Sequence, residues 1–236
     1  HRDGYLNGGI VLSEAEVEEL RDELDRVIVN DGKSDVPQPV ELRNMNRKNP
    51  DAPVWQVVNI WEVSDAYRRL LSHPKITEEI AQFTGAKGLR IWHDQIQYKP
   101  PVKGGTTSWH QDAPLWPIIK PMTEVSAWVA LDDADECNGC LFFGEGTNND
   151  NVIPHIAPEG EPFNLLIPDD VATQYKMTPA PVRRGGVSFH HGNTLHQSST
   201  NRSHRWRRAC AMHYGNRETQ LVNSALTYDM DAVVLF

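Results

Sequence analysis

Cysteine is scarce in this 236-residue sequence, and its spacing argues against a covalent framework. The three cysteines, Cys137, Cys140 and Cys210, are too few for the disulfide network that holds small secreted folds together. Cys137 and Cys140 have C-x-x-C spacing, but a structural zinc site needs four ligands and the chain has no second pair. The Asn138-Gly139 dipeptide between them is typical of a tight hairpin turn. We therefore expect an apolar core to stabilise the fold without covalent links.

The sequence also lacks an excess of positive charge and long apolar runs. Lysine and arginine total 23 against 32 aspartates and glutamates, which gives a net charge of −9. Because nucleic acids and anionic membranes attract positive surfaces, we expect neither as a partner. No apolar run approaches the roughly 18 residues of a membrane span, and no charged-then-apolar leader is visible. We predict a cytoplasmic protein that is a monomer or a homodimer.

Helical patterns occupy the first third of the chain. Residues 13–16 (SEAE) form a capping box, and apolar residues follow at helical spacing until the Asn-Asp-Gly stop at residues 30–32. The polar segment from there to Pro53 is interpreted as a long loop. Two shorter helices are predicted at residues 64–71 and 74–83, the second with proline at its start.

Strand patterns dominate the rest of the chain. Strands are predicted at residues 55–61, 89–98, 125–131, 140–143, 187–190 and 205–214, separated by turns rich in Pro, Gly, Asn and Asp. Helices followed by many strands indicate a mainly β protein with helices packed on the outside of its core. Since no linker divides the sequence, we predict a single domain over residues 1–236, with the N-terminal helices as its support.

A His-x-Asp tripeptide, His110-Gln111-Asp112, is the main candidate for a metal site. Residues i and i+2 of a strand point to the same face, so the imidazole and the carboxylate would converge. With a distant second histidine, such a pair makes the 2-His-1-carboxylate triad of non-haem iron(II) oxygenases. His190, His191 and His196 are clustered downstream, and spacing alone does not choose among them.

Ordered sequence blocks extend over most of the chain. They are residues 109–112 (WHQD), 128–133 (WVALDD), 138–141 (NGCL), 189–192 (FHHG), 196–198 (HQS), 201–203 (NRS) and 207–209 (RRA). Together these blocks resemble the phytanoyl-CoA dioxygenase family of 2-oxoglutarate-dependent oxygenases. The resemblance implies a double-stranded β-helix, or jelly-roll, core. It also selects His196 as the second histidine, so that His110, Asp112 and His196 would be the catalytic residues that bind iron(II).

The resemblance further implies where the cosubstrate binds. Arg207 matches the arginine that binds 2-oxoglutarate, and a guanidinium suits a carboxylate because it can bind both oxygens at once. Ser198 matches a hydroxyl group on the same carboxylate, while Gln97 and Trp116 match positions that contact the cosubstrate in related enzymes. Arg208 is the nearest rival to Arg207, but strand alternation places it on the opposite face.

The implied activity is oxidation of a small molecule by O2, with 2-oxoglutarate as cosubstrate and succinate and CO2 as products. A carboxylate at Asp112 favours oxygen transfer, since related halogenases have a small residue there. We therefore predict a dioxygenase that hydroxylates an aliphatic C–H bond, with desaturation, cyclisation or epimerisation as alternatives within the same chemistry. The alternative of a different class is a cupin-like metal-binding isomerase or a non-catalytic small-molecule binder, neither of which needs Arg207 beside Ser198.

Substrate contacts are predicted from residue type alone. Trp61 and Phe143 are large enough to line a pocket, and Arg43 in the polar segment is a candidate for meeting an anionic substrate. Residues 144–148 (GEGTN) depart from the Pro-Gly-Ser-His sequence that the family often shows there. The sequence also shows no basic patch suited to the phosphates of coenzyme A, so we expect a smaller acceptor.

Overall fold

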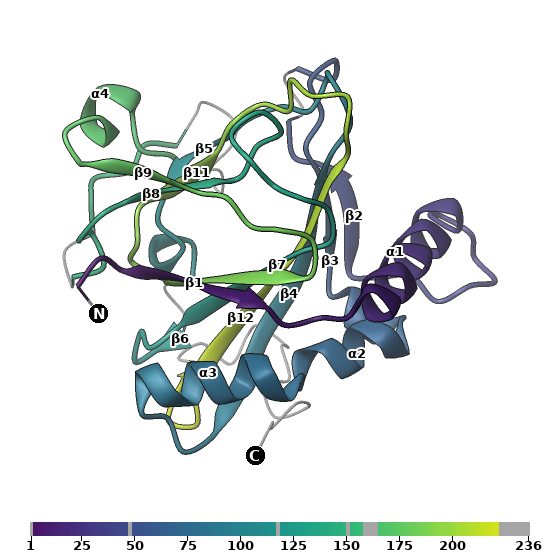
Figure 1. Cartoon of the computed structure of the whole chain (residues 1–236), viewed down its shortest axis with the longest axis horizontal. Helices are drawn as coiled ribbons and strands as arrows, with labels where there is room; N and C mark the ends of the chain where they lie inside the picture. Colours follow the sequence, from purple (N-terminus) through teal and green to yellow (C-terminus); the bar gives the residue numbers. More distant parts are fainter. Residues whose placement is uncertain (1, 47–48, 117–118, 150–151, 158–164, 222–236) are drawn as a thin grey trace.

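Two facing sheets of antiparallel strands form the centre of the molecule, as in a jelly roll (Figure 1). The computed structural model describes residues 2–46, 49–116, 119–149, 152–157 and 165–221. The larger sheet has seven strands in the order β1-β10-β7-β12-β4-β3-β2. In that order their bounds are Tyr5–Ile10, Gly186–His191, Val125–Ala130, Arg207–Asn216, Leu89–Lys99, Trp55–Val58 and Glu41–Asn44.

The smaller sheet faces the inner side of the larger one and has four strands in the order β5-β11-β8-β9. In that order their bounds are Thr107–His110, His196–Ser198, Leu141–Gly144 and Met177–Ala180. The remaining short elements are β6 (Ile119–Lys120), β13 (Gln220–Leu221), η1 (Ile60–Glu62), η2 (Ala113–Leu115) and α4 (Asp169–Ala172). The fold class predicted from the sequence, mainly β with flanking helices and a jelly-roll core, is confirmed.

Three N-terminal helices lie against the larger sheet: α1 (Glu14–Val29), α2 (Asp65–Leu71) and α3 (Pro74–Thr84). The predicted capping box is present, because the Ser13 hydroxyl accepts a hydrogen bond from the Glu16 backbone N–H while the Glu16 carboxylate accepts one from the Ser13 N–H. Helix α3 ends at Gly85, whose φ of 71° is a left-handed conformation that favours glycine.

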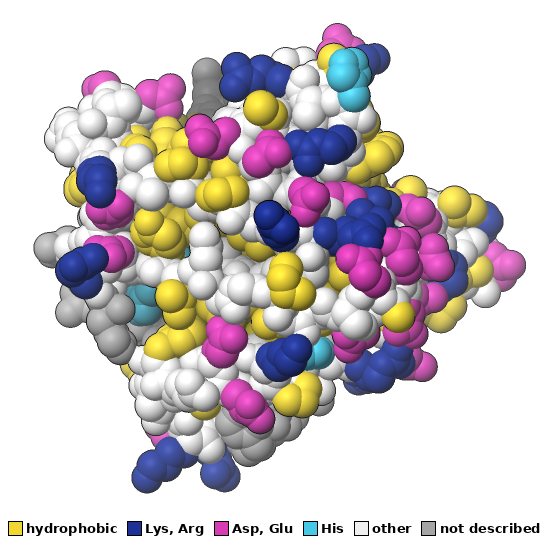
Figure 2. Space-filling model, in the orientation of Figure 1, with side chains coloured by type: hydrophobic (Ala, Val, Ile, Leu, Met, Phe, Trp, Pro, Cys, Tyr) yellow, Lys and Arg dark blue, Asp and Glu magenta, His cyan; other side chains and the backbone are white. Residues whose placement is uncertain are grey.

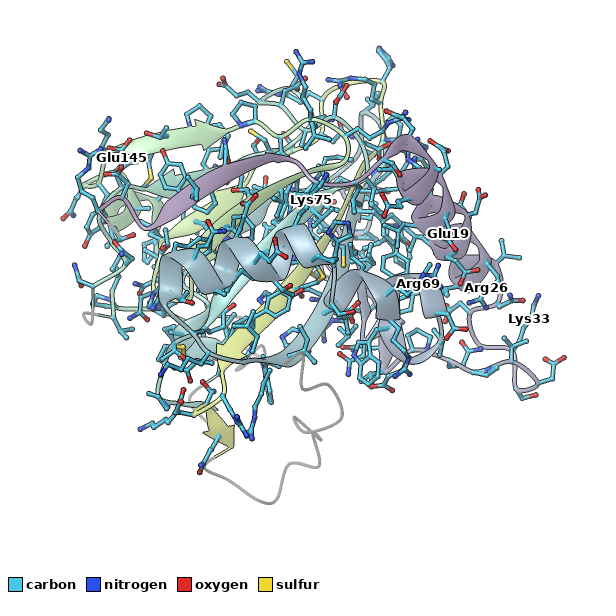
Figure 3. The ribbon with its side chains drawn as sticks, turned by 60° about the horizontal axis from the view of Figure 1, so that its bottom comes forward. Glu19, Arg26, Lys33, Arg69, Lys75 and Glu145 are labelled. Atoms are coloured by element: carbon cyan, nitrogen blue, oxygen red, sulfur yellow. The ribbon has the colours of Figure 1, made fainter. Side chains whose placement is uncertain are left out.

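Charges of both signs are interspersed on the exposed surface around α1 (Figure 2). Arg69 of α2 forms an ion pair of 2.6 Å with Glu19 of α1, which joins the two helices at the surface (Figure 3). None of the helices in the described part of the chain combines the length and apolar character that crossing a membrane requires. The cytoplasmic location stays a prediction.

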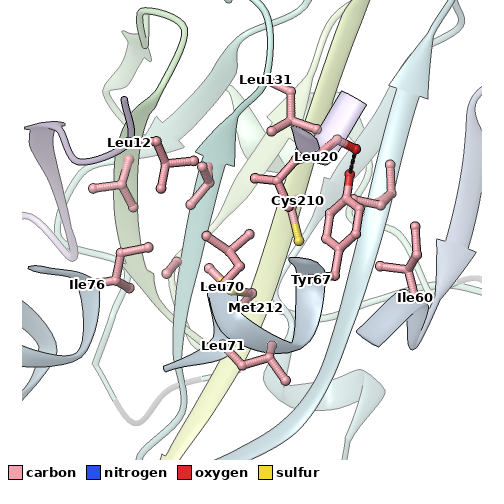
Figure 4. Close-up of a cluster of buried hydrophobic side chains, with 14 of the residues drawn as sticks. Leu12, Leu20, Ile60, Tyr67, Leu70, Leu71, Ile76, Leu131, Cys210 and Met212 are labelled. Carbon is pink, nitrogen blue, oxygen red and sulfur yellow. Dashed lines mark hydrogen bonds between the residues drawn. The ribbon is translucent and has the colours of Figure 1, made fainter. Parts of the chain in front are cut away.

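The main apolar core lies between the three helices and the outer face of the larger sheet. Helix residues such as Leu20, Tyr67 and Leu71 pack there against Cys210 and Met212 of β12 (Figure 4). The buried Tyr67 hydroxyl donates a hydrogen bond of 2.9 Å to the Leu20 carbonyl, so the one polar atom of this side chain is satisfied. A second, smaller cluster fills part of the space between the two sheets.

The structure differs from the sequence-based interpretation at the N-terminal side. The predicted loop before Pro53 contains β2, and β1 was not predicted; these are the two edge strands of the larger sheet. The strand predicted at residues 55–61 ends at Val58, because Asn59 adopts a left-handed conformation with φ of 55° and the helical turn η1 follows. The three cysteines are free, as expected. A single domain over residues 1–236 stays a prediction, since residues 222–236 lie outside the described part.

Candidate metal centre and cosubstrate pocket

Three candidate metal ligands come together at one end of the smaller sheet. His110 is the last residue of β5 and His196 the first residue of β11, and the two face each other in register. Asp112 lies just beyond β5, in a helical conformation at the start of η2. The strand alternation that we invoked for His110 and Asp112 was therefore the wrong reason for their convergence: the chain turns after His110 and brings the carboxylate back.

The ligating atoms are close enough to share one ion. The Asp112 Oδ1 atom lies 3.6 Å from His110 Nε2 and 3.8 Å from His196 Nε2. One ligand atom from each residue lies within 4.8 Å of the other two, and the two imidazole rings are 4.1 Å apart. All three side chains come from rigid elements or their ends, so the site is preformed.

The protonation states also suit a metal. The Nδ1–H of His110 donates to the Ser108 carbonyl at 2.8 Å, and that of His196 donates to the Thr194 carbonyl at 2.9 Å. These bonds leave the Nε2 lone pair of each ring available, as in most protein metal sites. Burial lowers the pKa of both histidines to about 4, so each is neutral at physiological pH.

The carboxylate completes the donor set. Burial alone would raise the pKa of Asp112, but the neighbouring His196 and a hydrogen bond from His190 hold it well below its usual range. The resulting donors are two neutral imidazole nitrogens and one ionised oxygen. This combination, with one side left open, fits iron(II).

The other two histidine candidates take different positions. His190 Nε2 lies 3.3 Å from Asp112 Oδ2, which is the carboxylate oxygen on the side away from the His110 and His196 contacts. His190 is therefore placed to orient Asp112 rather than to complete the triad. His191 is half-buried, and its Nδ1 accepts a hydrogen bond from the Asn193 backbone N–H.

A buried polar cluster behind Asp112 was missed by sequence reasoning. The Ser126 hydroxyl lies 3.3 Å from Asp112 Oδ2, 2.7 Å from Glu124 Oε1 and 2.7 Å from His213 Nδ1. Burial, together with the charge of Asp112, raises the pKa of Glu124 well above its usual range. Glu124 and Ser126 alternate with apolar residues at the start of β7, a signal that was present in the sequence.

The predicted cosubstrate arginine is fully buried at the start of β12. One Arg207 Nη donates to the Gln97 carbonyl at 3.0 Å and the other lies 3.5 Å from the Ser198 hydroxyl, while the guanidinium stands 5.6 Å from the centre of the Trp128 ring. Within the described residues no carboxylate forms an ion pair with Arg207, and its Nε has no hydrogen-bond partner. Burial lowers the pKa of Arg207 to about 10, so it remains charged at pH 7.

A second buried cation, Lys99, shares the same serine. The Lys99 ammonium donates to the Ser198 hydroxyl at 2.6 Å and to the carbonyls of Ser198 and Ser199 at 3.0 and 2.7 Å. It too lacks a carboxylate partner among the residues described, and burial together with the charge of Arg207 lowers its pKa well below the usual range. Sequence reasoning missed Lys99, although it continues the polar alternation of Gln95 and Gln97 on β4.

A cavity between the two sheets joins the metal ligands to Ser198 and Gln97, whose oxygen atoms accept hydrogen bonds from Lys99 and Arg207. It is small, with a volume of about 20 Å³, and Gln97, Ser198 and Trp128 line it together with the three metal ligands. Further lining residues are Gln95, Thr107, Leu141, His190, Gln197, Ala211 and His213. A buried cationic end that faces a donor set for a metal suits a ligand with a carboxylate at one end and a chelating group at the other.

The remaining predicted residues lie at various distances from this cavity. Trp116 packs edge-on against His213, with the ring centres 4.6 Å apart, so it lies beside the polar cluster behind Asp112. Phe143 is fully buried, and its ring centre is 6.2 Å from that of His196. Trp61 packs against the outer-face core under Arg68, so the structure does not bring it to the cavity.

Arg43 and Arg208 do not line the cavity. Arg43 lies on β2, where its guanidinium bonds to the Gln56 side chain and to Glu41. Arg208 forms a two-point ion pair with Asp132, at 2.8 and 3.0 Å, which agrees with the expected opposite orientation to Arg207.

Residues 144–148, which depart from the family sequence, help to position His196. The Thr147 hydroxyl accepts a hydrogen bond of 2.8 Å from the Leu195 backbone N–H, and the Gly144 N–H donates to the Leu195 carbonyl at 2.8 Å. Since Leu195 directly precedes His196, residues 144–148 fix the start of β11 in this chain.

Comparisons with known proteins agree with this geometry. The family described as phytanoyl-CoA dioxygenase (PhyH) matches residues 1–209. The peroxisomal phytanoyl-CoA dioxygenase of Mus musculus is 25% identical over 229 residues, which cover 93% of this chain and 67% of the mouse protein. The phytanoyl-CoA dioxygenase domain-containing protein 1 of Danio rerio is 36% identical over 152 residues, covering 62% of this chain and 52% of the fish protein.

Solved structures show the same fold. The non-haem α-ketoglutarate-dependent carbocyclase SnoK from nogalamycin biosynthesis has a TM-score of 0.76 and 25% identity, over 93% of this chain and 82% of SnoK. The epimerase SnoN, solved with Fe3+, α-ketoglutarate and nogalamycin RO, has a TM-score of 0.76 and 24% identity, over 95% of this chain and 84% of SnoN.

Proposed function

The chain belongs to the phytanoyl-CoA dioxygenase family of iron(II)- and 2-oxoglutarate-dependent oxygenases, and we propose that it hydroxylates an aliphatic C–H bond of a small-molecule metabolite. Succinate and CO2 would be the products from the cosubstrate. One observation carries the proposal: a buried His-Asp-His donor set shares a cavity with residues that contact two buried basic side chains, Arg207 and Lys99, and neither has a carboxylate partner in the described chain.

His110, Asp112 and His196 would hold the iron. When bound, the iron supplies the activation of O2, which no side chain of the protein can perform. The protein residues keep the two imidazoles neutral and the carboxylate ionised, and His190 and Ser126 orient that carboxylate. Partners of this kind behind a metal ligand tune both metal affinity and activity.

Arg207, Lys99 and Ser198 would bind the far carboxylate of 2-oxoglutarate. Burying a charge without a counter-charge costs several kcal/mol, and burial together with Arg207 lowers the pKa of Lys99 well below its usual range. An anion bound beside both groups would offset the Arg207 charge and favour the charged form of Lys99. A dicarboxylate bound in this way would direct its keto-acid end towards the metal ligands along the cavity. Gln97 lines the cavity and stays a predicted contact, as does Trp116 beside His213.

Cyclisation or epimerisation is the second candidate outcome. The observation that favours it is the similarity to the carbocyclase SnoK, at 25% identity and a TM-score of 0.76. All these outcomes begin with oxidation at a C–H position, and the placement of the substrate decides which follows. Mass spectrometry of the product separates them, since hydroxylation adds one oxygen atom whereas ring closure removes two hydrogens and epimerisation changes no mass.

A cupin-like isomerase or a non-catalytic binder would leave the buried cations unexplained. The test is to add 2-oxoglutarate to the anaerobic iron(II) protein and record the visible spectrum. We expect a weak charge-transfer band in the wild type and none in Asp112→Ala. A wild-type protein that binds iron(II) without developing the band would overturn the proposal.

Turnover gives the second measurement. Succinate release from 2-oxoglutarate is followed across a metabolite library with iron(II) and ascorbate present, and Asp112→Ala serves as the blank. Partners other than the small-molecule substrate are not expected, and the monomer or homodimer and the cytoplasmic location belong to the proposal.

A further inference from the structure

We propose that a row of hydrogen-bonding side chains across the inner face of the larger sheet recognises the substrate, and that it selects a neutral, hydroxyl-rich molecule of the polyol or glycoside class over a hydrocarbon chain. This inference rests on the proposed oxygenase function and specifies its substrate. We call this set the polar row; its members are Ser126, His213, Gln95, Gln56 and Arg43, one from each of β7, β12, β4, β3 and β2.

The polar row is continuous from the metal centre to the edge of the sheet. Ser126 contacts Asp112 and lies 2.7 Å from His213 Nδ1, and His213 Nε2 lies 3.0 Å from Gln95 Nε2. The Gln95 amide oxygen accepts a hydrogen bond from the Gln56 amide. The row ends at Arg43.

At its outer end the row carries a balanced pair of charges. Arg43 Nε donates to the Gln56 amide oxygen at 3.1 Å, and its Nη1 lies 3.1 Å from the Glu41 carboxylate. Both side chains of this ion pair are more than a third exposed, at 39% and 37%. Because Glu41 offsets the charge of Arg43, this end of the row favours a neutral polar group rather than the anion that we expected from Arg43 alone.

The inner part of the row borders the cavity. Gln95 and His213 line the cavity that also contains the metal ligands, and Gln95 is only half-buried although β4 is a central strand. Ala211, beside them on β12, also lines this cavity, and its small side chain leaves room there. A substrate that reaches the metal centre from this side therefore meets the row.

The row retains hydrogen-bonding capacity after its internal bonds are counted. A glutamine amide has two N–H donors and an oxygen with two lone pairs, and the internal bonds use one N–H of Gln95 and one of Gln56. The remaining donors, with the Glu41 oxygens as acceptors, match hydroxyl groups because a hydroxyl both donates and accepts.

A hydrocarbon chain would be a poor ligand for this surface. Covering a polar group without giving it a partner costs about 1–3 kcal/mol, and a site built to hydrogen-bond a substrate discriminates strongly against an analogue that lacks the bonding group. Gln56, Ser126 and His213 are already buried, so an acyl chain against the row would cover the free hydrogen-bonding groups of Gln95 and of the Arg43–Glu41 pair. The alternative role for the row is a purely structural one, in which it only stiffens the sheet.

The first test compares two classes of probe in the iron-loaded protein with 2-oxoglutarate and O2. Succinate release is measured with methyl glycopyranosides, inositols and aryl glycosides, and with fatty acids and their CoA thioesters of matched carbon number. We expect stimulation by members of the hydroxylated set. Stimulation by acyl compounds alone, or by no hydroxylated probe, would overturn the inference.

The second test uses two variants and a matched control. Arg43→Met and Gln56→Leu should each raise KM for the stimulating glycoside by about tenfold, which corresponds to about 1.4 kcal/mol, while KM for 2-oxoglutarate changes much less. The control is Arg69→Met, because Arg69 is also an exposed arginine paired with a glutamate but lies on α2 (Figure 3). This control should leave both constants unchanged.

The outcomes separate the two proposals. If Gln56→Leu fails to fold, Arg43→Met still decides, since Arg43 is partly exposed on an edge strand. Variants that lower the melting temperature without raising the glycoside KM would show a purely structural role. Absence of the iron–2-oxoglutarate band in the wild type overturns the proposed function, whereas a band with acyl-only stimulation overturns this inference alone.

Discussion

The two faces of the larger sheet are made by the same strands but have opposite composition. On β4, Ile91 and Ile96 belong to the outer-face core under the helices, while Gln95 and Gln97 line the inner cavity. On β12, Met212 packs outward and its neighbour His213 lines the cavity. Alternation along a single strand thus divides its residues between stability and chemistry.

This difference shows where buried polar groups are tolerated. A core that only stabilises a fold excludes unpaired charges, and on the outer face the buried carboxyl of Asp94 has its pKa raised to about 8, which favours its neutral form. The inner face holds Arg207 and Lys99, which have no carboxylate partner among the described residues, and a cluster of histidines and carboxylates, and such groups are costly to bury without a ligand. Substitutions on the inner face should therefore change function, and those on the outer face should change stability.

Asp112→Ala should have the largest effect. It removes one of three metal ligands, and since even the outer partners of metal ligands cost about 10–100-fold when removed, we expect activity to fall by more than that. Iron content and succinate release are the measurements, and Asp169→Ala on the exposed side of α4 is the control. Retention of iron and turnover by Asp112→Ala would show that the inner face does not hold the metal here.

Arg207→Ala tests the cationic end of the cavity. Removing one member of a buried charged contact costs about 2–5 kcal/mol, which is roughly 30-fold or more in affinity. We expect this loss in the Kd for 2-oxoglutarate, measured by the charge-transfer band, with iron(II) affinity little changed.

The adjacent arginine provides the control for this prediction. Arg208→Ala breaks the ion pair with Asp132 on the opposite side of β12, so it should lower stability but leave 2-oxoglutarate binding intact. Equal Kd values for wild type and Arg207→Ala would remove the cosubstrate assignment.

The sequence was sufficient to predict the helices and strands that local residue patterns determine. The capping box at Ser13 located α1, and apolar alternation located β4, β7 and β12 to within one or two residues. Edge strands β1 and β2 were not predicted, because β2 carries only one apolar residue and β1 depends on a partner far away in the chain. β1, for example, pairs with β10, about 180 residues later.

Part of the site could be predicted because local sequence motifs identify its residues. Motif matches located His110, Asp112 and His196, which line one cavity, and Arg207, which contacts the cavity residue Gln97. Lys99 was missed, because its role depends on the approach of Ser198 from the smaller sheet rather than on its own neighbours. Contacts between the two sheets are set by the fold, and no spacing in the sequence reports them.

Ile96→Ala should affect stability alone. Ile96 is fully buried in the outer-face core, between two residues of β4 that line the cavity. Truncating a buried isoleucine to alanine costs about 2–5 kcal/mol, which urea denaturation would measure. Well below the melting temperature, we expect unchanged KM for 2-oxoglutarate. A change in KM with unchanged stability would contradict the division between the two faces.

The smallest effect concerns Asp94, an acidic residue on the outer face. Asp94 is fully buried, neither carboxylate oxygen has a hydrogen-bond partner, and burial raises its pKa to about 8 although nearby backbone N–H groups offset part of the shift. Below pH 4 the side chain is protonated in both states. As the pH rises the unfolded chain ionises first, so stability falls between about pH 4 and pH 8 and then levels off.

Asp94→Asn should remove this component of the pH dependence. Urea denaturation at pH 5, 6.5 and 8 should show the variant gaining on the wild type as the pH rises, because only the wild type loses stability when the unfolded chain ionises. Glu124 and the site histidines titrate in both proteins, so the difference between the two curves isolates Asp94. Parallel curves would mean that Asp94 is already ionised in the folded protein, and the outer face would then tolerate charge as the inner face does.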